Sequence, residues 1–181
     1  MRKYRTRSWR AFEPGAAPGR LAPVAGLRIL GLDPGSRRTG FGVIDCSSGQ
    51  SVQVAHGCIA PAEESLSGRL RSIFQGVHEL IEKYQPTEVA VERVFVNRNI
   101  DSALKLGHAR GAALCAVPQT LPVFEYAPRA IKLAIVGFGA AEKVQVAHMI
   151  RTLLHVEGRI SADAADALAV AVCHAHSRRI G

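Results

Sequence analysis

The pattern of apolar and polar residues divides the chain, from residue 27 onward, into short strand-like and longer helix-like segments. Short apolar runs bounded by Gly, Pro, Ser or Asp are typical of strands. The predicted strands cover 27–33, 41–46, 51–59, 87–92 and 121–126. Apolar residues that recur at three- to four-residue spacing are typical of amphipathic helices. The predicted helices cover 66–84, 100–117, 142–155 and 162–178.

The order of these elements indicates the fold class. Three strands joined by short turns come first, and the remaining strands alternate with helices. A meander followed by crossover connections predicts an α/β protein whose mixed sheet of five strands is flanked by helices. A chain of 181 residues has room for one such domain, which we expect over residues 27–181.

Residues 1–26 have a different composition from the rest of the chain. They contain six basic residues against one acid, Glu13, and several Pro and Gly residues. Such a segment cannot build a core, and its Pro and Gly residues interrupt the amphipathic helix of an organellar transit peptide. We therefore predict a disordered basic N-terminal extension, which carries much of the net charge of +8.

Cysteine spacing and hydropathy bear on the cellular compartment. No pair of cysteines has the spacing of a zinc ligand set, so we expect four free, small core residues in a reducing cytoplasm. These are Cys46, Cys58, Cys115 and Cys173. No apolar run approaches the roughly 20 residues that span a bilayer, so no membrane association is expected.

Two acids lie at the ends of predicted strands. Asp33 follows the apolar run 29–32, and Glu92 follows the apolar run 89–91. If these strands are parallel neighbours, their carboxylates meet at the sheet edge where open α/β proteins place their sites. The alternatives are that Asp33 only shapes a Pro-Gly turn and that Glu92 is exposed to solvent.

Two further acids lie on one face of the last predicted helix. Asp163 and Asp166 are separated by three residues, and the same face continues through Val170 and Cys173. Asp163 has an alternative role opposite the helix dipole, since Ser161 is a candidate N-cap. Asp166 lies beyond the first turn on an apolar stripe, where a structural reason for an acid is missing.

Convergence of these four acids would require a counter-charge. Like charges repel and are costly to bury, so four converging carboxylates imply divalent cations. A set of oxygen ligands suits Mg²⁺ or Mn²⁺ rather than zinc. Two such ions per site can hydrolyse a phosphodiester, which predicts nuclease chemistry.

Four separated motifs, in order, resemble the RuvC family of bacterial Holliday-junction resolvases. They are residues 30–43 (LGLDPGSRRTGFGV), 91–95 (VERVF), 101–107 (DSALKLG) and 162–169 (ADAADALA). The resemblance covers residues 28–178. It implies a ribonuclease-H-like fold and a homodimer that makes paired, metal-dependent cuts in four-way DNA junctions during recombination and repair. It also implies RuvA and RuvB as branch-migration partners.

The resemblance also suggests roles for individual residues. By motif position, Asp33, Glu92, Asp163 and Asp166 correspond to the catalytic carboxylates of the family. Phe95, Lys132 and Lys143 correspond to DNA contacts, the two lysines close to the cleaved strand, whereas Lys105 and Arg110 have weaker claims to such a role. Phe95 would stack on junction bases, the alternative being a core contact. The chain departs from the family at two positions, where Arg93 and His108 replace glutamines.

Other functions compete with this interpretation. The turn 33–40 also resembles the phosphate loop of actin-like and sugar-kinase-like ATPases, but that superfamily closes two lobes and does not predict the second acid pair. A non-catalytic nucleic-acid binder would gain from losing four anions. The pair His174 and His176 could ligate a metal, but ordinary packing or surface roles are favoured. Phe41, Phe74 and Phe124 are expected in the core.

The predicted helix 100–117 carries a face of small residues at helical spacing. These are Ala103, Gly107, Gly111 and Ala112. Such a face allows two helix backbones to approach closely, so we expect it at the interface of a two-fold dimer. The alternative is that this face packs against its own sheet.

Overall fold

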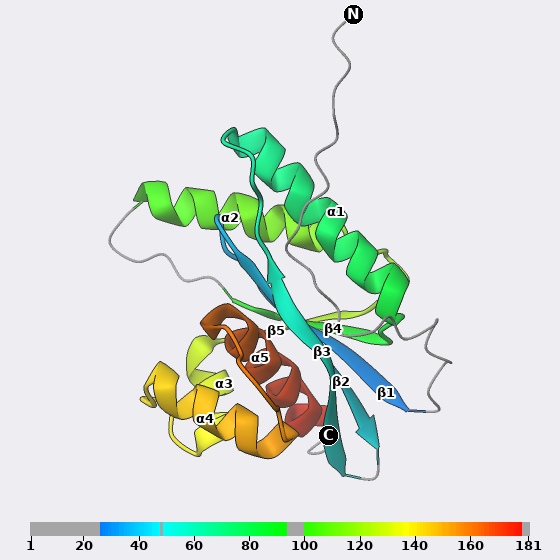
Figure 1. The fold of residues 1–181 in the computed structure, drawn as a ribbon, viewed down its shortest axis with the longest axis vertical. Helices are drawn as coiled ribbons and strands as arrows, with labels where there is room; N and C mark the ends of the chain where they lie inside the picture. The colour runs from blue at the N-terminus through cyan, green and yellow to red at the C-terminus, as the bar shows by residue number, and fades with distance from the viewer. Residues whose placement is uncertain (1–25, 48, 94–99, 179–181) are drawn as a thin grey trace, which may run out of the picture.

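The computed structural model describes residues 26–47, 49–93 and 100–178, which form a five-stranded mixed sheet in the order β3-β2-β1-β4-β5 (Figure 1). The strands are β1 (Leu27–Asp33), β2 (Thr39–Ser47), β3 (Gln50–Ile59), β4 (Glu88–Glu92) and β5 (Val123–Tyr126). β1, β2 and β3 pair antiparallel, whereas β4 is parallel to both β1 and β5. The expected fold class and all five strands are confirmed.

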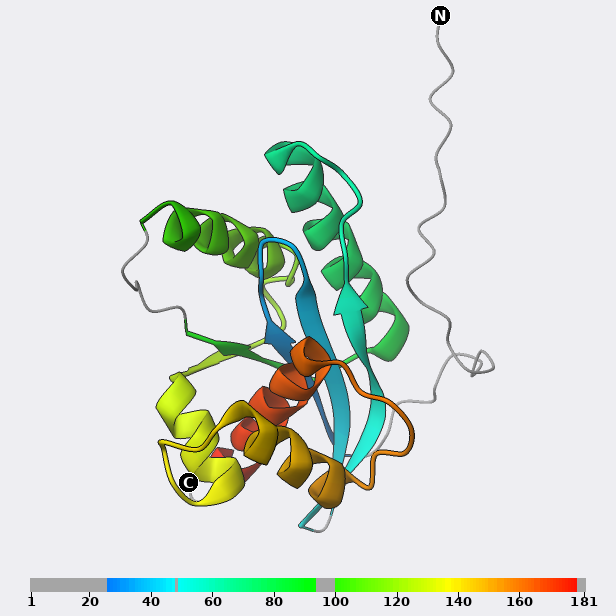
Figure 2. The ribbon, with the colours of Figure 1, turned by 60° about the vertical axis from the view of Figure 1, so that its left-hand side comes forward.

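Helices cover both faces of the sheet (Figures 1 and 2). They are α1 (Leu66–Tyr84), α2 (Ile100–Cys115), α3 (Pro128–Val136), α4 (Lys143–Leu154) and α5 (Ala162–Arg178). One buried cluster joins α1 and α2 to the sheet, and a second joins α3, α4 and α5 to the opposite face. Alternate residues of the central strand β1 supply both clusters, since Leu30 and Leu32 face α1 whereas Ile29 faces α5.

α5 lies unusually close to the first two strands. A Cβ atom added at Gly31 would overlap the backbone carbonyl of Ala167, and one at Gly40 would overlap the carbonyl of Asp163. At Gly42 the added atom would meet the Leu168 side chain at 2.6 Å. Only glycine permits this approach, which brings the start of α5 to the edge of the sheet where β1 ends.

α3 was not predicted from the sequence. It is a helix of nine residues with only Ile131 and Ile135 buried, so its apolar periodicity is weak. Two local signals mark it nevertheless. Pro128 occupies the first turn, and Gly137 ends the helix with a left-handed φ of 88°.

Several expected core residues are not in the core. Phe41 is buried, but Phe74 is 41% exposed on α1 and stacks on His78. Phe124 is half-buried and stacks on the His174 ring. All four cysteines are free: Cys173 is buried, Cys46 is partly buried against the core, Cys58 is half-buried, and Cys115 is exposed, so the core assignment was wrong for Cys115. Within the described ranges, no helix is both long and apolar enough to cross a membrane.

Substitution of Gly31 by alanine tests the close approach of α5. The added methyl meets a backbone oxygen that cannot rotate away, so Gly31→Ala should lower the free energy of unfolding by about 3 kcal/mol. Urea denaturation of metal-free protein measures this loss. The matched control is Val52→Ala, which changes a 60% exposed side chain on β3 and should alter stability by less than about 0.5 kcal/mol. Equal effects of the two substitutions would contradict the packing argument.

Candidate active site

Strand pairing brings Asp33 and Glu92 together. β1 and β4 run parallel, and their last register pair joins Leu32 to Val91. Asp33 and Glu92 each follow that pair by one residue, at the carboxyl ends of neighbouring strands. Both side chains point to the α5 face, since alternate residues of the two strands, Ile29 and Ala90, contribute to the α5 cluster. The expectation that these two strands are parallel neighbours is confirmed.

The first turns of α5 supply the second pair of acids. The Ser161 hydroxyl accepts a hydrogen bond from the Ala164 amide at 3.2 Å, which caps the helix and fixes its start. Asp163 and Asp166 follow at the spacing that places both on one face. The close contact of Gly40 with the Asp163 backbone holds this turn against the start of β2. Asp33 therefore meets acids that are distant in the sequence.

Two cations are paired with the acids of α5. The Lys143 ammonium, from the first turn of α4, donates a hydrogen bond of 2.7 Å to the Asp166 carboxylate. The Arg38 guanidinium, from the β1–β2 turn, lies 3.0 Å from the Asp163 carboxylate. The Cys58 thiol also lies 3.6 Å from that carboxylate. Lys143 was expected close to the reaction site, whereas the contact of Arg38 was not anticipated.

The two acids on the strands, Asp33 and Glu92, have raised pKa values. Burial, together with the negative charges of Asp33 and Asp166, raises the pKa of Glu92 to about 7, against the opposing charges of Lys143 and Lys132. Burial and the Asp166 charge likewise raise the pKa of Asp33 to about 6, against the opposing effect of Lys143. Both shifts mean that the folded protein resists placing another negative charge at this point. Bound cations would relieve that resistance.

A cleft of about 190 Å³ opens beside these acids. Its lining includes the acids Glu92 and Asp166 together with Lys132 and Lys143. Lys132 lies on α3, whose first turn follows directly from the end of β5. The cleft therefore combines carboxylates with cations at the sheet edge, an arrangement suited to a phosphate group and metal ions together.

The donor chemistry of the site fits divalent cations of the magnesium type. All four acids offer oxygen ligands, and the raised pKa values of Asp33 and Glu92 mark a shortage of nearby positive charge. Among the residues that the structure describes, no three His, Cys, Asp or Glu side chains are yet in position to hold a metal ion. Asp163 and Asp166 are instead turned toward Arg38 and Lys143, so ligation requires these two side chains to rotate.

Other predicted site residues lie away from the acids. Lys105 forms an ion pair with Asp101 within α2, and Arg110 forms one with Glu125 on β5. Arg93 also contacts Glu125, at 3.6 Å. Neither Lys105 nor Arg110 lines the cleft. Phe95 falls outside the described residues.

His174 and His176 make packing and hydrogen-bond contacts within the fold. His174 is completely buried and hydrogen-bonded, and His176 faces the Ala134 carbonyl at 3.3 Å. Neither belongs to a metal-binding group among the described residues. The expectation of packing roles is confirmed for His174.

The raised pKa of Glu92 predicts how stability depends on pH. The folded, metal-free protein keeps a proton on Glu92 up to about pH 7, whereas the unfolded chain releases it near pH 4.5. The free energy of unfolding should therefore fall as pH rises from about 5 to 8, by on the order of 2 kcal/mol. Glu92→Gln removes this titration, so its pH profile should be flatter. Urea titrations of both proteins in chelator compare the slopes, and equal slopes would contradict the assignment.

Comparisons with known proteins agree on one family. The model of the family described as "Crossover junction endodeoxyribonuclease RuvC" matches residues 29–174. The protein of that name from Xanthomonas campestris pv. campestris (strain B100) is 57% identical over 154 residues, covering 83% of this chain and 88% of the relative. The one from Shewanella sp. (strain W3-18-1) is 55% identical over 152 residues, with the same coverages.

Solved structures agree with the sequence comparison. Thermus thermophilus RuvC in complex with a Holliday junction substrate is 33% identical and superimposes with a TM-score of 0.79, covering 86% of this chain and 96% of that one. The yeast mitochondrial Holliday junction resolvase Ydc2, at 15% identity and a TM-score of 0.60, shares the fold over 82% of this chain and 77% of its own. The family model, the curated relatives and the Thermus thermophilus structure favour the nuclease over the kinase-like alternative. The chain belongs to the crossover junction endodeoxyribonuclease RuvC family.

Proposed function

We propose that Asp33, Glu92, Asp163 and Asp166 are the catalytic carboxylates of this crossover junction endodeoxyribonuclease and that they hold two Mg²⁺ ions. The observation that carries the proposal is the convergence of four acids from three elements at one sheet edge, where burial and repulsion raise the pKa of two of them. Oxygen ligands in a negative cluster favour a hard divalent cation, and Mn²⁺ is expected to replace Mg²⁺.

The four acids differ in how freely their side chains can move. Two such ions, when bound, activate a water for attack on a DNA phosphate and stabilise the leaving oxygen. Asp33 and Glu92 keep their positions because strand pairing holds their backbone. Asp163 and Asp166 give up their contacts with cationic side chains when they ligate.

Basic residues around the cleft would hold the cut strand. Lys132 lines the cleft, and Lys143 and Arg38 are paired with acids that the ions would engage. Once freed, these two cations can donate charge-assisted hydrogen bonds to a phosphate. Phe95 is proposed to stack on junction bases, and Lys105 and Arg110 to contact DNA farther from the cut.

The substrate that we propose is a four-way DNA junction. The Thermus thermophilus RuvC structure that this chain resembles contains a Holliday junction substrate. RuvA and RuvB remain proposed partners, on the family resemblance alone. The family match begins at residue 29, which supports a nuclease domain over 27–181 preceded by a basic extension over 1–26. We also propose a cytoplasmic location.

A homodimer would supply the two cuts that resolution requires. The small-residue face of α2 is open at Gly107 and Gly111, where an added Cβ would meet nothing within 4 Å, whereas Ala112 packs against the buried cluster on the α1 side of the sheet. Ile100 and Leu104 on the same helix are 72% and 58% exposed. α2 packs inward mainly through Ala109 and Ala113, which leaves an apolar and shallow outer face for a second copy.

Replacement of one carboxylate tests the site. Asp33→Asn removes a metal ligand and a negative charge, so junction cleavage in Mg²⁺ should fall at least about 100-fold while junction affinity is kept or improved. Cleavage of a synthetic immobile junction and binding in Ca²⁺ measure the two effects. The matched control is Glu82→Gln, an exposed acid in the last turn of α1 that does not line the cleft. Substantial turnover by Asp33→Asn would contradict the proposal.

A bulky residue on α2 tests the dimer. Gly107→Leu fits the isolated protomer, because space is open at this position, but it blocks close helix approach. We expect a folded monomer in sedimentation experiments, with paired incision of a junction lost by at least about tenfold. A wild-type monomer that makes coordinated cuts would exclude this arrangement.

A further inference from the structure

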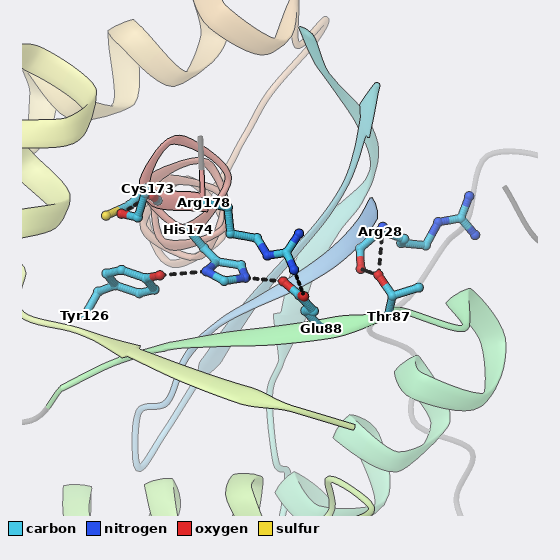
Figure 3. A network of polar contacts seen from close by, with 8 residues as sticks. Arg28, Thr87, Glu88, Tyr126, Cys173, His174 and Arg178 are labelled. Atoms are coloured by element: carbon cyan, nitrogen blue, oxygen red, sulfur yellow. Dashed lines mark hydrogen bonds and ion pairs between the residues drawn. The ribbon is translucent and has the colours of Figure 1, made fainter. Parts of the chain in front are cut away.

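A chain of polar contacts crosses the core on the α5 side of the sheet (Figure 3). His174, completely buried on α5, lies at its centre. Its Nδ1 atom is 2.6 Å from the Tyr126 hydroxyl, and its Nε2 atom is 2.5 Å from a Glu88 carboxylate oxygen. The other Glu88 oxygen is 2.9 Å from the Arg178 guanidinium. The Phe124 ring stacks on the imidazole at a centroid distance of 4.4 Å.

The partners assign one tautomer to the imidazole. The Glu88 carboxylate can only accept, so Nε2 carries the hydrogen. Burial raises the pKa of Tyr126, which keeps its phenol protonated and able to donate to Nδ1. Because Glu88 is already paired with Arg178, a neutral ring leaves this buried group balanced in charge. The Tyr126 hydroxyl then donates to His174, His174 donates to Glu88, and Glu88 also accepts from Arg178.

The surroundings of His174 explain why a directional contact is needed. α5 meets the sheet mostly through alanines and through glycines of β1 and β2. Small residues give shallow ridges and few steric stops against sliding of the helix along the sheet. Apolar residues of similar volume would serve stability as well as a buried polar group does, whereas polar groups specify register.

The contact is also coupled in space to the carboxylate cluster. Tyr126 is the register partner of Glu92, and its carbonyl accepts a hydrogen bond of 2.8 Å from the Arg93 amide. His174 lies eight residues after Asp166 on the same helix, or about 12 Å along its axis. A shift of α5 against β5 therefore changes the separation of Asp166 from Glu92 directly.

We propose that His174 and Tyr126 are positioning residues that fix the register of α5. They thereby hold the backbone of Asp163 and Asp166 where these side chains can ligate the same metal ions as Asp33 and Glu92. The proposal rests on the assignment of those four carboxylates as the metal site. It gives the buried imidazole a role in the reaction although neither His174 nor Tyr126 lines the cleft. The measurable consequence is that loss of the Tyr126–His174 contact weakens metal binding more than it weakens the fold.

Metal affinity of otherwise intact protein tests this role. Tyr126→Phe removes one hydroxyl, and Mn²⁺ binding to the metal-free protein is followed by electron paramagnetic resonance. We expect a three- to tenfold weaker Mn²⁺ affinity and a matching rise in the Mg²⁺ concentration for half-maximal cleavage, with junction affinity unchanged. The control is Ile73→Val, a fully buried change on the opposite face of the sheet. If both variants bind Mn²⁺ like the wild type at similar loss of melting temperature, the proposal is wrong.

Two substitutions of the histidine separate its two contacts. An asparagine at 174 can accept from Tyr126 at the place of Nδ1, whereas a glutamine can donate to Glu88 at the place of Nε2. His174→Asn should therefore keep Mn²⁺ affinity within about twofold, and His174→Gln should lose it as Tyr126→Phe does. The reverse order would contradict the role of the Tyr126 contact.

The tautomer gives a readout that needs no metal. Nitrogen-15 spectra of ring-labelled protein at neutral pH should show His174 as the neutral Nε2–H form, with an Nδ1 shift that moves in Tyr126→Phe. A dominant Nδ1–H form would overturn the proposal. Failure of the carboxylate assignment has a different signature, because Asp33→Asn would then bind Mn²⁺ as tightly as the wild type.

Discussion

The contact between α5 and the first two strands is the constraint on which the rest of the structure depends. Backbone carbonyls of α5 lie where the side chains of Gly31 and Gly40 would otherwise stand. This approach brings the helix-borne acids to the strand-borne ones, and it also makes the helix almost entirely buried. This contact is made largely by small residues, and the hydrogen bonds of His174 with Tyr126 and Glu88 are the directional contacts that we propose fix its register.

The electrostatics of the site follow from the same geometry. Acids held by strands cannot move apart or out to solvent, so burial first and mutual repulsion second raise the pKa values of Asp33 and Glu92. Acids held by the helix have free side chains, so repulsion is relieved by turning toward Arg38 and Lys143. The four carboxylates thus form two pairs. Asp33 and Glu92 are held rigidly and would be stabilised by added positive charge, whereas Asp163 and Asp166 can rotate and are already paired with cations.

Sequence patterns predicted the strands and most helices of the protein better than the contacts between its distant side chains. Apolar runs located all five strands, and the position of Asp33 and Glu92 after such runs indicated their meeting point. α3 was missed because two buried residues in nine give little periodicity, although Pro128 and Gly137 mark its ends. Contacts between distant side chains, such as Arg38 with Asp163 or Glu88 with His174, leave no local pattern, because the residues next to one partner in the sequence do not identify the other partner.

The place of α5 in the chain has a consequence for biosynthesis. β1 is the first element of the sheet and supplies Asp33, whereas the helix that supplies Asp163 and Asp166 is the last of those described. A ribosome therefore completes the sheet before half of the carboxylates exist. Nascent or truncated chains that stop before residue 163 carry two of the four acids, so under the proposed assignment a fragment that reaches DNA lacks the groups to cut it.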